Sequence, residues 1–114
     1  MKKFIVYRLP VDKSESRHNA ELVSVEYGEN IAEATTALVK AAAADLSALP
    51  EYNGWGTTAF EPEEMHPGRK YQYIMHGVVY PPNAAENILV DFVIREEIVQ
   101  PEEYPPEFNP EKIS

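Results

Sequence analysis

Two apolar runs between Tyr71 and Val99 constrain the fold of this chain more than any other part of it. They are separated by Pro81, Pro82 and Asn83, and proline at these positions cannot continue a helix because it lacks the backbone donor and fixes φ. Both runs are rich in β-branched and aromatic residues, which favour strands. We therefore predict a β-hairpin with a loop of several residues.

The first of these runs is apolar on both of its faces. A helix covers only one face of a sheet, so we expect the other face to be covered by a loop, by the carboxyl-terminal segment or by a second copy of the protein. The face that carries Tyr71 is the one we select as a candidate contact surface. By strand alternation, the two faces hold Tyr71, Tyr73, Met75 and Val79 on one side and Ile74, His76, Val78 and Tyr80 on the other.

Three further elements precede the hairpin. Alternating residues predict strands over 4–9 and 22–27. A helix follows, with Asn30 as its N-cap, Glu33 at the capping-box position and Pro50 closing it. We predict a single small α+β domain in the order ββαββ, with a four-stranded, mainly antiparallel sheet and one helix on one face. The apolar helix stripe that would cover this sheet comprises Ile31, Thr35, Leu38, Ala42, Leu46 and Leu49.

Two segments show no periodicity. Residues 51–70 contain turn signals such as Asn53-Gly54, and we predict a long loop that is either functional or folded back onto the core. Residues 101–114 alternate proline with glutamate, which predicts an extended tail. The expected organisation is thus a compact domain over residues 1–100 and a tail over 101–114.

Composition excludes several classes of protein. The chain has no cysteine, which removes disulfides, thiolate metal sites and a cysteine nucleophile. It has no apolar run long enough to span a membrane, and we expect a soluble, cytoplasmic protein. The net charge of −9 disfavours generic nucleic-acid binding, although such a charge also suits an inhibitor or immunity-type protein that mimics nucleic acid.

Few residues suggest chemistry. Trp55 lies between glycines, where it is suited either to stack on a ligand or to fill the core. His66 lies among carboxylates whose spacing matches no metal motif, and His76 lies in a predicted strand. No nucleophile elbow and no phosphate loop is present, so we predict no catalytic residue, no metal and no cofactor. The candidate ligand-binding or partner-binding residues are Trp55, Tyr71, Tyr73, Met75, His66 and His76.

Three hypotheses for function follow. The leading one is a protein-binding module without catalytic activity that self-associates through an exposed sheet face. The alternative is a small-molecule binder or enzyme with a pocket between the sheet and the 52–69 loop. The third is the inhibitor or immunity-type protein.

Overall fold

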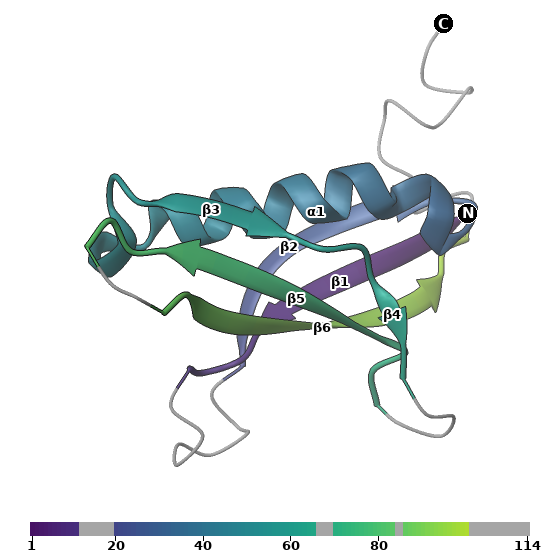
Figure 1. The fold of residues 1–114 in the computed structure, drawn as a ribbon. Coiled ribbons are helices and arrows are strands. Elements are labelled where there is room, and N and C mark those ends of the chain that lie inside the picture. Colours follow the sequence, from purple (N-terminus) through teal and green to yellow (C-terminus); the bar gives the residue numbers. More distant parts are fainter. Residues whose placement is uncertain (12–19, 66–69, 84–85, 101–114) are drawn as a thin grey trace, which may run out of the picture.

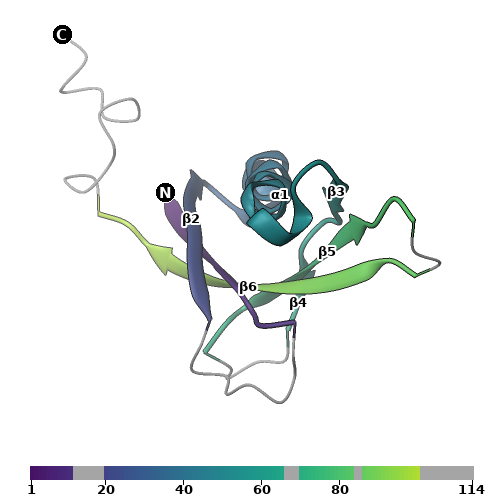
Figure 2. The same ribbon diagram turned by 90° about the vertical axis from the view of Figure 1, so that its left-hand side faces the viewer.

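The chain folds into a curled antiparallel sheet that wraps around one long helix (Figures 1 and 2). The computed structural model describes residues 1–11, 20–65, 70–83 and 86–100. Their elements are β1 (Lys2–Arg8), β2 (Glu21–Gly28), α1 (Ile31–Ala48), the 3₁₀ turn η2 (Pro50–Tyr52), β3 (Gly56–Ala59), β4 (Glu63–Glu64), β5 (Tyr73–Tyr80) and β6 (Ile88–Ile98).

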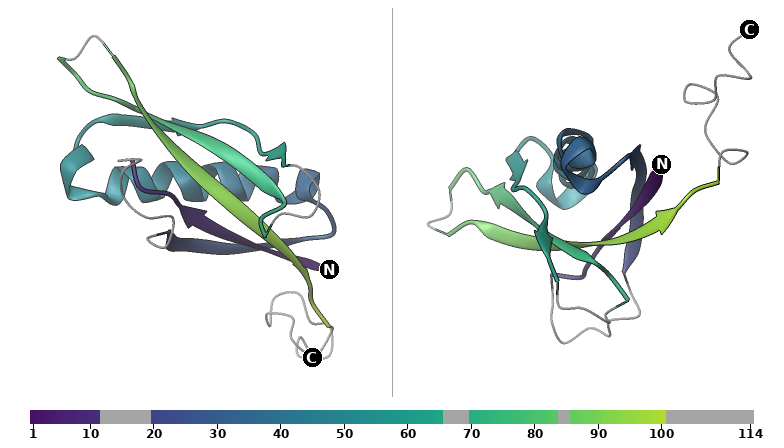
Figure 3. Two further views of the ribbon diagram at one scale, coloured as in Figure 1. Left: turned by 90° about the horizontal axis from the view of Figure 1, so that it is seen from below. Right: turned by 90° about the vertical axis from the view of Figure 1, so that its right-hand side faces the viewer.

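The predicted hairpin is confirmed, and its second strand is the centre of the sheet. The strand order is β2-β1-β6-β5-β3, with β4 also paired to β5, and every pairing is antiparallel. Strand β6 is the longest at 11 residues and pairs with β1 on one side and β5 on the other. Figure 3 shows β6 crossing the middle of the sheet, with β2 along one border.

The α+β class is confirmed, but the four-stranded sheet and the ββαββ order are wrong. The segment 51–70, predicted as a loop, contributes β3 and β4, so the described residues form a six-stranded sheet. These strands have four and two residues, too few to show alternation in the sequence. Tertiary contacts hold β3 in place, because the Thr57 hydroxyl donates to the Ala43 carbonyl oxygen of α1 at 3.0 Å.

The helix begins and ends where the sequence predicts. The Asn30 side chain accepts a hydrogen bond from the Glu33 backbone N–H at 2.9 Å, which caps the first turn. Thr35, expected in the apolar stripe, is only partly buried and donates its hydroxyl to the Ile31 carbonyl oxygen. The fully buried stripe is Ala34, Leu38, Ala42 and Leu46, spaced four residues apart along one side of α1.

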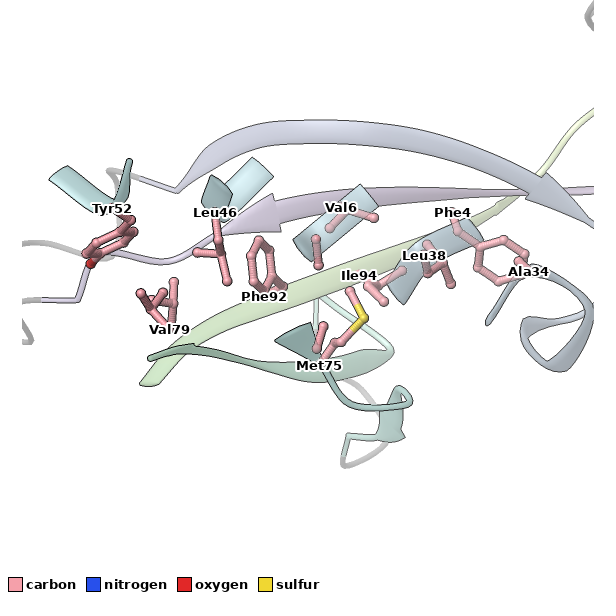
Figure 4. Close-up of a cluster of buried hydrophobic side chains, with 13 residues drawn as sticks. Phe4, Val6, Ala34, Leu38, Leu46, Tyr52, Met75, Val79, Phe92 and Ile94 are labelled. Carbon is pink, nitrogen blue, oxygen red and sulfur yellow. The ribbon is translucent and has the colours of Figure 1, made fainter. Parts of the chain in front are cut away.

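The core lies between this stripe and the concave inner face of the sheet (Figure 4). Phe4, Phe92 and Met75 are completely buried there. Gly77 lets the Leu46 side chain of the helix approach the sheet closely. A Cβ at position 77 would lie 2.8 Å from Phe92 Cε2, 2.9 Å from Leu46 Cδ1 and 3.1 Å from the Val90 carbonyl oxygen.

The structure also decides which face of β5 the helix covers. Tyr73, Met75 and Val79 belong to or pack against the core on the inner face, so the face that we selected as a contact surface is the one turned towards α1. The uncovered face of β5 is therefore the one that bears His76 and Val78.

The predicted tail, 101–114, lies outside the described residues. In the described part of the chain, no helix combines the length and the apolar character required to cross a membrane.

Substituting Gly77 with alanine tests the close contact between β5 and α1. We expect Gly77→Ala to lower the free energy of unfolding by about 1–3 kcal/mol, because the new methyl overlaps Phe92 and Leu46. Gly56→Ala is the matched control, since its Cβ would meet only Tyr80 side-chain atoms at an ordinary 3.5 Å. Urea unfolding of both variants is the measurement, and equal stabilities would contradict the packing described here.

Candidate functional site

The convex outer face of the sheet has no covering helix among the described elements. We define the outer face by the positions that alternate with the core positions and by the strand registers. Its members are Lys3, Ile5, Tyr7, Leu22, Val25, Tyr27, Gly56, Thr58, Glu63, Ile74, His76, Val78, Tyr80, Leu89, Asp91, Val93, Arg95 and Glu97.

The centre of the outer face is apolar and tightly packed. Ile5, Val78 and Val93 are buried although α1 lies on the other side of the sheet. Near them, the rings of Tyr7 and Tyr71 meet edge to face, with centroids 5.7 Å apart. This face is thus not a plain solvated surface.

The exposed apolar side chains of the outer face include a group near the tip of the β5–β6 hairpin. Leu89 is 67% exposed and lies directly opposite Val78 in the register. Tyr80, two residues further along the same face of β5, is 43% exposed. We call Val78, Tyr80 and Leu89 the hairpin patch.

A charged cluster borders this patch. His76 lies opposite Asp91, and its Nδ1 is 2.8 Å from Asp91 Oδ1. Its Nε2 is 3.5 Å from Glu63 Oε2 of β4. The register places the pair His76–Asp91 directly beside the pair Val78–Leu89.

The cluster is not built like an acid–base site. Both ring nitrogens of His76 face a carboxylate, so neither is directed at an open position where a substrate would sit. All three side chains are at least 40% exposed, which means that water screens their charges. Within the described ranges, no three His, Asp or Glu side chains are arranged to hold a metal ion.

Two open clefts lie elsewhere. One, of about 270 Å³, is lined by Arg8, Leu49 and Tyr52 at one end of the core. The Arg8 guanidinium there already lies 2.6 Å from Asp45 Oδ2, and a second contact at 3.8 Å joins it to Glu21. The other cleft, of about 370 Å³, runs between α1 and the segment Ala59–Glu61.

The structure does not bring the predicted site residues together. Tyr73 lies on the inner face and His76 on the outer face, so they do not line one pocket. Met75 is fully buried, and Trp55 packs on the core with its ring 5.8 Å from that of Tyr52. His66 lies outside the described residues.

Tyr71 and Tyr73 also occupy different environments. Tyr71 contacts Tyr7, and the Lys70 ammonium lies 5.4 Å from its ring centroid. The Tyr73 hydroxyl donates to Glu96 Oε1 at 3.3 Å, and its ring meets the edge of Phe4. Burial, reinforced by the negative charge of Glu96, raises the pKa of Tyr73 above 10.0.

Neither the partners of His76 nor the hairpin patch is evident from the sequence. Asp91 and Leu89 fall on one face of β6 by strand alternation, but their alignment with His76 and Val78 depends on the hairpin register. That register is not fixed by the sequence, because the loop is longer than a two-residue turn.

Comparisons with protein-family models, with curated proteins and with solved structures found no match to this chain.

The raised pKa of Tyr73 predicts a change in stability at alkaline pH. Because the folded state holds this proton more tightly than the unfolded state, the contribution is complete below pH 10.0 and is lost as the pH rises through the folded pKa. We expect Tyr73→Phe to lose less unfolding free energy than the wild type as the pH rises above 10.0. Urea titrations on both sides of that pH give the slope, with the exposed Tyr80→Phe as control; identical slopes for wild type and Tyr73→Phe would refute the assignment.

Proposed function

We propose that this chain is a protein-binding module that contacts its partner through the outer face of the sheet, with the hairpin patch at the centre of the contact. The observation that carries the proposal is the exposure of Leu89 and Tyr80 beside Val78 on a face without a covering helix. Aromatic and apolar side chains surrounded by polar groups are typical of protein interfaces.

The surroundings of the patch favour a basic partner. Asp91 and Glu63 flank His76 next to the patch, and the chain as a whole carries a net charge of −9. A partner with lysine or arginine side chains around an apolar centre would complement both features. Such binding weakens as salt is added, because exposed charges are screened.

Neither the small-molecule binder or enzyme nor the inhibitor or immunity-type protein is supported by an equally specific observation. The two clefts are open, and the one charged group of the first cleft that would attract an anion, Arg8, is paired with Asp45. The acidic charge suits an inhibitor that mimics nucleic acid, but the part of the chain described here supplies no further feature in its favour. Binding through the hairpin patch therefore remains our proposal.

Removing the apolar group at position 89 tests the proposal. A photo-crosslinking residue at position 89 in the native host identifies the partner, and the same residue at position 98 is the control. Leu89→Ser is then expected to weaken binding of the purified partner about tenfold, because a buried leucine in an interface contributes on the order of 1.4 kcal/mol or more.

Ile98→Ser is the matched control, since Ile98 is 77% exposed but lies at the far end of β6. It should bind the partner as the wild type does. Equal affinity of wild type and Leu89→Ser, or the same proteins captured from positions 89 and 98, would contradict the proposal.

A further inference from the structure

Strand β2 forms a border of the sheet in the described structure. Seven of its eight residues, all but Val23, pair with β1, and no described element lies beyond it in the sheet (Figure 3, left). An edge strand of this length is a template for another strand unless it is protected. The usual protections are charged side chains, proline and bulges; β2 contains no lysine and no proline, and its charged residues are Glu21 and Glu26.

The pairing of β2 with β1 contains one β-bulge, and the rest of the strand is regular enough to pair with another strand. The register with β1 shifts between Val6 and Tyr7, which places the bulge at Val23. From Ser24 to Gly28 the pairing is regular. Val25, in the middle of the strand, points to the outer face and is 36% exposed.

Ser24 supplies a second, independent observation. Its Oγ is buried and has no hydrogen-bond partner among the described residues. A buried hydroxyl without a partner is costly, so a group that arrives to bond it gains more than an ordinary surface contact does. Ser24 lies on this edge strand, on the same face as Glu26.

We infer that β2 pairs with β2 of a second copy in an antiparallel, two-fold arrangement with Val25 on the axis. This register places Val25 opposite Val25 and Ser24 opposite Glu26 of the other copy. The Ser24 hydroxyl then has a carboxylate acceptor within reach, since directly opposed residues have Cβ atoms about 5 Å apart.

The neighbouring registers are less favourable. Moving the axis one residue towards the carboxyl end places Glu26 opposite Glu26, and like charges in direct opposition are destabilising. Moving it one residue towards the amino end brings the bulged Val23 into the centre of the pairing. A second copy is thus the occupant that this edge fits, and the inference does not depend on the function proposed for the hairpin patch.

A charge swap at the axis tests this arrangement. Sedimentation of the wild-type chain at micromolar to submillimolar concentration is expected to show a dimer. Val25→Lys and Val25→Glu should each weaken the dimer about a hundredfold, because each places two like charges on the axis. Mixing the two variants should restore a dimer, since only an arrangement with residue 25 opposite residue 25 converts both repulsions into one attraction.

Ile98→Lys and Ile98→Glu are the matched controls, because Ile98 is an exposed apolar residue at the end of β6, away from the β2 edge. They should leave the dimer unchanged, and circular dichroism checks that every variant is folded. A monomeric wild type, a dimer that survives both Val25 substitutions, or failure of the mixture to dimerise would each overturn the inference.

Ser24→Ala supplies a readout that a purely structural role would not give. Removing the hydroxyl should leave the unfolding midpoint of the dilute monomer unchanged or raised, since the group has no partner there. The dimer should become about tenfold weaker, because a hydrogen bond to a charged acceptor is lost. A dimer of wild-type affinity would overturn the Ser24–Glu26 pairing and with it the proposed register.

Discussion

The close packing of α1 in the curled sheet is the interaction on which the rest of this structure depends. Small residues make it possible: Ala34 and Ala42 on the helix are fully buried, and Gly77 on β5 has no side chain between Leu46 and the sheet. The helix therefore lies deep in the concave side, where Figure 2 shows the strands rising on both sides of it. The core residues of the inner face pack against the helix, so they are not available to bind a partner.

Because α1 covers the inner face, a binding site must lie on another surface of the sheet. Two of the residues that the sequence pattern selected, Met75 and Tyr73, belong to or pack against the core, and Met75 is not accessible to a partner. The surfaces left over are the outer face, with its hairpin patch beside His76, and the β2 border. Our two proposals use these two surfaces separately, so a dimer through β2 leaves the hairpin patch of each copy free to bind.

Local features were predictable from the sequence, whereas long-range ones were not. The Asn30 cap and the β5–β6 hairpin depend on neighbouring residues, and both predictions are confirmed. The pairing of β1 with β6 joins segments about ninety residues apart, and the short β3 is held by the Thr57–Ala43 hydrogen bond rather than by its own pattern. Strand propensity and residue alternation depend on neighbouring residues, so they do not predict such long-range contacts.

The orientation of β5 had a signal in the sequence that was not used. Both faces of this strand are apolar, so hydrophobicity alone does not say which one meets the helix. Gly77, however, falls on the same face as Met75 and Val79. A glycine inside a strand marks a site where another element approaches closely, and this would have selected the inner face correctly.

Amide hydrogen exchange at low and at high protein concentration distinguishes the central strand from the edge strand. We expect the amides of β6, which are paired on both sides, to exchange most slowly at every concentration. We expect the amides of β2 to gain protection as the concentration rises, because β2 of a second copy then pairs with this edge. Exchange in β2 that is independent of concentration, or exchange in β6 as fast as in β2, would contradict the packing and the dimer described above.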